Sequence, residues 1–245
     1  MFIFFEDRLP DSPLVERVWR CHSERTGTFL SVAANHFEMA VTRHRGKAFL
    51  TVRGPETRAT SVDCPAEGEW LGIRFALGTF MPQLPPGRLI DGRDVTLGDA
   101  TSRSFWLDGS AWDYPTYENA DTFIARLIRK GIIVRDSTVD AAVRGEPSRL
   151  SARSTQRHFL RATGLTLSTV RQIERARRAT NLLRDGVSIL DTVHAAGYFD
   201  QAHLTRSLKY RIGQTPAEIA RGHQQLSFLY KTAPRRRSYD ASEVI

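Results

Sequence analysis

Cysteine and long apolar runs are scarce in this 245-residue chain, and both absences exclude classes of protein. The two cysteines, Cys21 and Cys64, cannot build a disulfide framework, and they favour a reducing compartment, the cytoplasm. We interpret both as small buried hydrophobic residues rather than nucleophiles. No apolar run approaches the ~20 residues that cross a bilayer. The apolar residues 1–5 are followed at once by three charged residues, so we expect neither a signal peptide nor membrane insertion.

Catalytic and metal-binding motifs are also scarce. The chain has no Gly-x-Ser-x-Gly nucleophile turn and no glycine-rich phosphate loop. His36 and His44 lie eight residues apart without a third ligand nearby, whereas a barrel metal site takes three or more clustered ligands. We therefore expect no metal, no cofactor and no enzyme activity.

Net charge is lacking in the first part of the chain and concentrated in the second. Residues 1–135 hold 17 Lys/Arg and 17 Asp/Glu, while residues 136–245 hold 18 and 10, which accounts for the whole net charge of +8. Of those 18 cations, 16 are arginine, the side chain suited to bidentate contacts with phosphate and guanine. The excess favours a polyanionic partner, most often nucleic acid, and a solvated basic surface is the alternative.

Residues 1–115 carry the pattern of short β-strands separated by turns. Runs rich in β-branched and aromatic residues alternate with turn formers such as Gly54-Pro55, which predicts an antiparallel sandwich or small barrel. All four tryptophans lie before residue 116, where they either enclose a small-molecule pocket or fill a core. The strands are expected at 29–34, 37–42, 48–52, 59–62 and 70–75.

A short amphipathic helix is expected in residues 116–136. It begins near Asn119 with an acidic residue in its first turn and ends in a basic turn before Gly131, which suits the helix dipole. Three roles stay open for this helix: a connector between domains, a dimer surface, or the first helix of the part that follows.

Helical signals dominate residues 137–228, and they repeat. A capping box with proline at the first helical position stands at 215–218, and a periodic run at 167–183 predicts one long helix. Two stretches match at an offset of 49 residues. The matched pairs are Ser151 with Asp200, Arg157 with Arg206, Phe159 with Leu208, Gly164 with Gly213 and Thr166 with Thr215.

Each copy of the repeat predicts a helix with an apolar face and a polar face. A short helix at 189–196 and a tight turn at Gly197 precede the second copy, which is the helix-turn-helix arrangement. An ordinary helical bundle with solvated arginines is the alternative. The inward residues are Thr155, Phe159 and Ala162 in the first copy and Leu204, Leu208 and Ile212 in the second.

The second copy reads GYFDQAHLTRSLK at 197–209 and GQTP at 213–216, and the first reads SARSTQRHF at 151–159. These runs resemble the C-terminal signature of the AraC/XylS transcription regulators. The resemblance implies two helix-turn-helix lobes joined by a long helix. More loosely, PLVERVW at 13–19 and LGIRF at 71–75 resemble the sensor domains of some members.

The resemblance also implies which side chains meet DNA. Ala202 has no hydrogen-bonding group, so it could touch only a thymine methyl. The base-reading positions are Arg153, Arg157, Gln201, Ala202 and Arg206, and the positions at or near the DNA backbone are Ser151, Arg161, His203, Thr205 and Lys209.

One departure concerns the first lobe. Between Gly131 and Ser151 there is room for one short helix, at 139–144, where the family usually has two. Either the 119–130 helix serves as the missing one, or the first lobe is reduced.

The expected fold class is therefore α+β. A β-rich effector or dimerisation domain (1–115) and a connecting helix (116–136) precede an all-α domain with two helix-turn-helix lobes (137–228) and a basic tail (229–245). Because the second part holds the whole charge excess, a fragment beginning near Asn119 is expected to bind DNA by itself.

The expected function is a sequence-specific DNA-binding transcription regulator that responds to a small-molecule effector. The partners are double-stranded DNA and, by the resemblance, RNA polymerase, the effector and a second copy of the chain, with no membrane. An alternative is a DNA-binding protein whose first domain is only a dimerisation or protein-interaction platform. A DNA-repair methyl acceptor, an activity sometimes fused to this type of domain, would need four cysteines at a zinc ion, and the chain has two.

Overall fold

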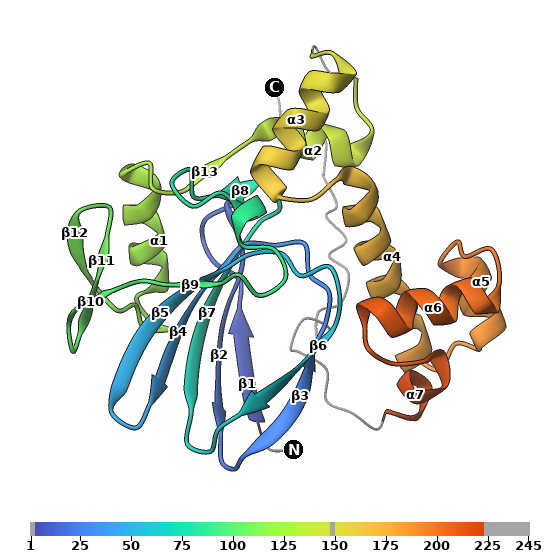
Figure 1. Cartoon of the computed structure of the whole chain (residues 1–245), viewed down its shortest axis with the longest axis horizontal. Helices are drawn as coiled ribbons and strands as arrows, with labels where there is room; N and C mark the ends of the chain where they lie inside the picture. Colours follow the sequence, from blue (N-terminus) through green and yellow to red (C-terminus); the bar gives the residue numbers. More distant parts are fainter. Residues whose placement is uncertain (1–2, 148–149, 223–245) are drawn as a thin grey trace, which may run out of the picture.

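The computed structural model describes residues 3–147 and 150–222, so the expected tail at 229–245 lies outside the described residues. Alternating apolar and polar residues build a six-stranded antiparallel sheet in the first part, in the order β1-β2-β7-β4-β5-β9 (Figure 1). The strands are β1 (Ile3–Arg8), β2 (Val15–Ser23), β3 (Gly27–Ser31), β4 (Glu38–His44), β5 (Lys47–Arg53), β6 (Thr60–Cys64), β7 (Glu69–Phe75), β8 (Thr79–Phe80), β9 (Val95–Thr96), β10 (Asp99–Thr101), β11 (Ser104–Leu107), β12 (Ser110–Asp113) and β13 (Val134–Arg135), with a 3₁₀ turn η1 (Pro86–Arg88).

One face of this sheet carries the largest core of the molecule. Leu71, Ile73 and Phe75 alternate along β7 and project from the same face, and each is at most 4% exposed. The three-stranded sheet β10-β11-β12 and helix α1 (Ala120–Arg129) cover that face and add the fully buried Trp112 and Ile124.

The opposite face is covered by a two-stranded ribbon. Backbone hydrogen bonds from Ser23 to Glu67 and Gly68 continue the pairing of β2 with β7 beyond the ends of these strands. The chain segments that adjoin these ends, β3 and β6, form the antiparallel ribbon. Phe29 on β3 and Cys64 on β6 pack in one cluster with Trp19, Cys21 and Trp70 of the sheet. Both cysteines are buried and unpaired, and burial raises the pKa of the Cys21 thiol, which opposes the thiolate that a nucleophile needs.

The second part is helical, so the α+β prediction is confirmed. Six helices follow β13 in the described part of the chain, and the side chain of the residue before each one accepts a hydrogen bond from a backbone N–H of the first turn. The helices, with their capping residues, are α2 (Ser137–Arg144, Asp136), α3 (Ala152–Thr163, Ser151), α4 (Leu167–Arg184, Thr166), α5 (Ile189–Ala195, Ser188), α6 (Gln201–Arg211, Asp200) and α7 (Pro216–Arg221, Thr215).

Helix α1 does not join the helical part. Its buried residues Phe123, Ile124 and Leu127 belong to the core of the first sheet, and β13 pairs with β8, so residues 116–136 pack on the first part of the chain. The helix-turn-helix unit before α4 therefore consists of α2 and α3 alone. Of the two alternatives for the first lobe, the structure has the reduced one.

Residues of the first part supply the packing that the short first lobe lacks. Ala33 and Phe80, 0% and 4% exposed, lie in one core with Val139 of α2, Phe159 of α3 and Ile173 of α4. The second lobe receives a smaller contribution from Val32 and Ala34, which pack with α4, α5, α6 and α7. Both lobes therefore complete their cores with residues from the loop between β3 and β4.

Candidate nucleic-acid interface

Helix α3 presents a row of arginines to solvent. Its side chains at 159 and 162 are buried, which turns the opposite face outward. Arg153, Arg157 and Arg161 are exposed on that face, and Ser151, which caps the helix, is exposed at its start. The Ser151 side chain accepts from the backbone N–H of Ser154. The remaining free N–H groups of the first turn and the positive end of the helix dipole lie at this same end, where a phosphate is favoured.

Helix α6 has the same organisation in the second lobe. Leu204 and Leu208 are fully buried, whereas the four polar or small residues Gln201, Ala202, Arg206 and Lys209 are exposed. Two further predicted site residues are half-buried. The ring of His203 packs edge-on against Tyr198 with 5.1 Å between ring centroids, and the Thr205 hydroxyl donates to the carbonyl of Gln201.

The 49-residue repeat is a repeat of structure. Ser151 and Asp200 are both N-caps, and Gly164 and Gly213 follow the two helices with φ of 73° and 82°. Thr166 and Thr215 then cap α4 and α7, and Glu218 completes the capping box predicted at 215–218. The outward arginines of the two lobes, at 157 and 206, therefore occupy equivalent places in two copies of one unit.

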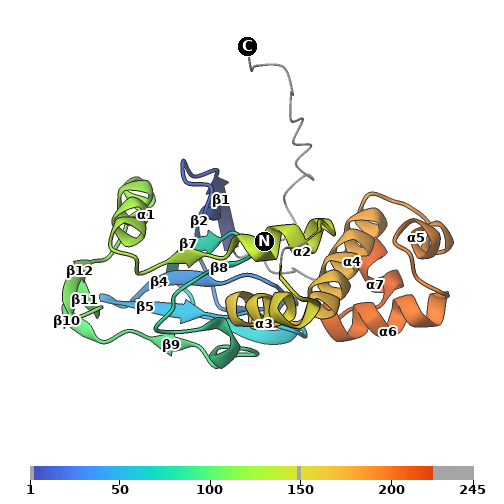
Figure 2. The same ribbon diagram turned by 90° about the horizontal axis from the view of Figure 1, so that it is seen from above.

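Helix α4 joins the two units. Its 18 residues correspond to about 27 Å at 1.5 Å per residue. Figure 2 shows α3 and α6 along the same edge of the molecule, beside α4. Two outward helices on one side of the molecule, joined by one helix, suit successive major-groove faces of a duplex.

The C-terminal end of α6 is fixed to the sheet part. Arg211 is 8% exposed, and its guanidinium donates to the carbonyl of Thr57 at 2.9 Å and to the Gln172 side chain of α4 at 2.5 Å. The backbone carbonyls of Tyr210 and Arg211 accept from Ala59 and Ala33. The exposed polar face of α6 is left free by these contacts, because they involve only the last turn.

Comparison with known proteins agrees with this geometry. Residues 148–222 match a family model described as a helix-turn-helix domain. This family model is that of the AraC-type helix-turn-helix domain. The match covers α3 to α7, so the AraC-type domain includes both outward helices. No curated protein and no solved structure matches the chain.

This match identifies the second part as the DNA-binding part of a transcription regulator. Helix-turn-helix domains bind DNA and are not themselves catalytic. None of the helices in the described part of the chain combines the length and the apolar character needed to cross a bilayer.

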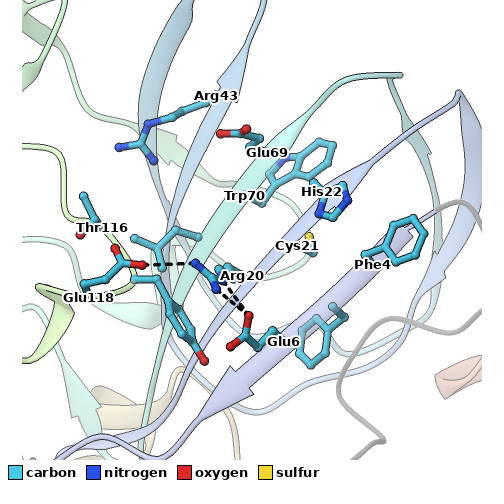
Figure 3. A pocket seen from close by; sticks show the side chains of 13 residues that line it. Phe4, Glu6, Arg20, Cys21, His22, Arg43, Glu69, Trp70, Thr116 and Glu118 are labelled. Atoms are coloured by element: carbon cyan, nitrogen blue, oxygen red, sulfur yellow. Dashed lines mark hydrogen bonds and ion pairs between the residues drawn. The ribbon is translucent and has the colours of Figure 1, made fainter.

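Two of the hollows in the first part lie on opposite faces of the six-stranded sheet. On the α1 side, an open groove is lined by the residues of Figure 3. Its central cation is already compensated: Arg20 pairs with Glu6 and Glu118 and lies over the ring of Tyr117 (Figure 3). At its rim, the Phe4 and His22 rings stack on each other. Arg43, Glu69 and Thr116 also line the groove (Figure 3).

The second hollow lies between the sheet and the β3–β6 ribbon. It has a volume of about 510 Å³ and contains three buried polar residues, His36, Glu38 and Arg74. Glu38 Oε2 accepts from Trp19 Nε1 at 3.2 Å and lies 3.6 Å from both His36 Nε2 and Arg74 Nε. Burial raises the pKa of Glu38, but His36 and Arg74 lower it by more, to about 2.

The sequence left a small-molecule pocket in the first part open as an alternative to a filled core, but its polar residues were not identified, although one signal was available. Glu38 and Arg74 stand in the middle of apolar strand segments, at 37–41 and 71–75, where a charge is costly to bury unless it is paired. Their pairing across β4 and β7 follows from the strand register, which opposes these two residues directly.

Proposed function

We propose that this protein is a sequence-specific regulator that reads DNA through both α3 and α6 and responds to a small molecule held by its first part. The observation that carries the proposal is the repeated unit: two capped helices, each with a buried apolar stripe and an exposed cationic face, inside an AraC-type helix-turn-helix domain.

Five residues are assigned to base edges and five to the DNA backbone. Arginine can donate two parallel hydrogen bonds to guanine, and glutamine can bond adenine in the same manner, so the outward polar face of each helix provides suitable groups. The base readers are Arg153, Arg157, Gln201, Ala202 and Arg206, and the residues at or near phosphates are Ser151, Arg161, His203, Thr205 and Lys209.

The distinction between readers and backbone contacts is testable with single substitutions. A preferred site is first selected from random-sequence duplex DNA, and binding to that site and to a random duplex is then titrated at several salt concentrations. Arg206→Ala should cost about 1–3 kcal/mol on the preferred site and much less on random DNA. Lys209→Ala should weaken both equally and lower the log–log salt slope by about one.

A matched control is Arg129→Ala, which removes the same charge from the exposed face of α1, away from both helices. It should leave both affinities nearly unchanged. Equal losses on both DNAs for Arg206→Ala would mean that this arginine contacts phosphate and does not read bases.

The effector role of the first part is supported by the hollow under the ribbon. A first part that served only as an interaction platform would need no such cavity, whereas one of about 510 Å³ with a few polar groups has the size and character of a ligand site. RNA polymerase and a second copy of the chain remain proposed partners. The division into 1–115, 116–136 and 137–228 likewise remains a proposal.

A further inference from the structure

The cavity under the ribbon has features that specify the chemistry of its ligand. Aromatic side chains from both layers line it: Trp19, Trp70 and Phe49 from the sheet and Phe29 from the ribbon. Such walls favour a flat, apolar ligand body, because aromatic rings prefer stacked or edge-on contacts with other rings.

The polar end of the cavity has unsatisfied hydrogen-bonding atoms. His36, Glu38 and Arg74 are 8%, 6% and 3% exposed, and all three line the cavity. Among the described residues, His36 Nδ1 has no hydrogen-bond partner, and neither has Arg74 Nε, which lies 3.6 Å from Glu38 Oε2, beyond hydrogen-bond distance. Buried polar atoms are nearly always bonded, so two such atoms beside one cavity point to a ligand group.

The roles of the two atoms can be assigned from their neighbours. Arg74 Nε can only donate. Burial lowers the pKa of His36, which keeps the ring neutral, and its Nε2 faces the carboxylate of Glu38. The single ring proton therefore belongs on Nε2, and Nδ1 is left as an acceptor. The ligand group that fits must accept one hydrogen bond and donate another.

The charged groups at the buried end of the cavity are already compensated, and Asp63, which also lines the cavity, is exposed and accepts from Thr28. Glu38 compensates Arg74, and Arg53 pairs with Asp94 at 3.4 Å. Glu56 accepts from Ser31, and burial raises the pKa of its carboxyl, which favours the neutral form. An added carboxylate or ammonium would lose its hydration without an unpaired counter-charge in the buried end.

We propose that this cavity binds an uncharged aromatic molecule whose polar end both donates and accepts a hydrogen bond, as a phenol or an amide does. The polar end donates to His36 Nδ1 and accepts from Arg74 Nε, and the body lies between the tryptophans and phenylalanines. This assignment depends on the proposed function in one respect: it identifies the class of effector that the first part would sense.

Bound ligand would act close to the reading helix. The cavity-lining residues Val32, Ala34 and Glu56 lie on two loops that are joined by reciprocal backbone hydrogen bonds between Ala34 and Glu56. The next residues along these loops, Ala33 and Thr57, bond to Arg211 at the end of α6. A ligand that shifts either loop therefore moves an anchor of α6 directly.

The test uses four compounds of one shape: biphenyl-4-ol, biphenyl, biphenyl-4-carboxylate and 4-biphenylmethylammonium. Their binding to the full-length protein is measured by calorimetry at neutral pH. Two added hydrogen bonds predict that biphenyl-4-ol binds about tenfold or more tightly than biphenyl. Both charged compounds should bind more weakly than biphenyl-4-ol.

Variants locate the binding. His36→Phe should remove the preference for biphenyl-4-ol over biphenyl, while His22→Phe, in the groove of Figure 3 on the opposite face, should keep it. Thr42→Phe fills the cavity from β4 without touching the buried charges and should abolish binding of all four compounds. It serves as the second variant if His36→Phe does not fold, as judged by circular dichroism.

Three results would overturn the proposal. They are tighter binding of either charged compound than of biphenyl-4-ol, equal affinities for biphenyl-4-ol and biphenyl, or no binding of biphenyl-4-ol to the folded protein. Binding that survives Thr42→Phe would also refute it, because the site would then lie elsewhere. Sequence-specific DNA binding is measured on the same preparation, so a protein that reads DNA but fails these tests refutes only the ligand assignment.

Discussion

Replacing Gly164 by alanine tests whether the first part of the chain supports the first helix-turn-helix lobe. Gly164 ends α3 with φ of 73°, and a Cβ built there would lie 2.8 Å from Gly87 N and 2.9 Å from Pro86 C. Both atoms belong to the backbone of η1, so no side-chain rotation can relieve the overlap. Alanine must therefore separate α3 from η1 or distort one of them.

The magnitude follows from a comparison with Gly131→Ala. Gly131 follows α1 with φ of 67°, and a Cβ there would meet no atom within 4 Å. Both variants carry the cost of left-handed backbone, about 1–2 kcal/mol per residue, and both gain the same reduction in unfolded-chain entropy. The difference isolates the steric overlap, and overpacking typically costs about 1–3 kcal/mol.

Urea unfolding followed by circular dichroism measures this difference. We expect Gly164→Ala to lose about 1–3 kcal/mol more than Gly131→Ala, with a lower affinity for the preferred DNA site because α3 is displaced. Equal free energies of unfolding for the two variants would show that η1 and α3 are not in contact in solution, and the inferred support of the first lobe would be wrong.

Three further predictions follow from other contacts. Glu38→Gln leaves Arg74 buried without its anion and should destabilise the protein by about 3–5 kcal/mol. In the unsubstituted protein the pKa of Glu38 falls from 4.5 to about 2 on folding, so the stabilisation by this carboxylate is complete above pH 4.5 and is lost as the pH falls toward 2. Acid titrations of the stability of both proteins measure this difference. Arg153→Ala and Arg157→Ala should each lower sequence discrimination in the titration described for Arg206, and unchanged discrimination in both would mean that the reduced first lobe does not read bases. Charge alone predicts that a fragment beginning at Asn119 binds DNA by itself, but this fragment lacks Ala33 and Phe80 of the first-lobe core. Its first lobe should therefore lose amide protection in hydrogen exchange and its specific affinity should fall below that of the full chain, whereas full affinity would show that the lobe is self-sufficient.

The helical part was largely predictable because its signals are local. Caps such as Ser151 and Thr215, glycines at helix ends and a 3.6-residue apolar period each depend on a few neighbouring residues, and the structure places all of them as expected. Helix α4 was expected at 167–183 and extends over Leu167–Arg184.

The sheet part was predicted less completely because its organisation depends on distant residues. The five expected strands correspond to β3, β4, β5, β6 and β7, with ends shifted by up to three residues. β2, which pairs with both β1 and β7, was not among them: Arg17, Arg20 and His22 interrupt its apolar pattern. Two of these polar residues are paired outside β2: Arg17 pairs with Asp7 of β1, and Arg20 pairs with Glu118, which is distant in the sequence.

The boundary suggested by charge differs from the boundary at which the molecule is packed. Charge divides the chain near residue 135, yet Ala33 and Phe80 from the neutral part are buried in the core of the first lobe, and Val32 and Ala34 in that of the second. Apolar residues do not change the net charge, so the charge distribution along the sequence could not reveal these contacts. Close-packed cores resist small continuous deformations. A shift of the 32–34 loop, which borders the ribbon cavity, must therefore be accommodated in both lobes at once. Through this shared packing, a ligand of the proposed site would act on both α3 and α6, the helices that we propose to read DNA.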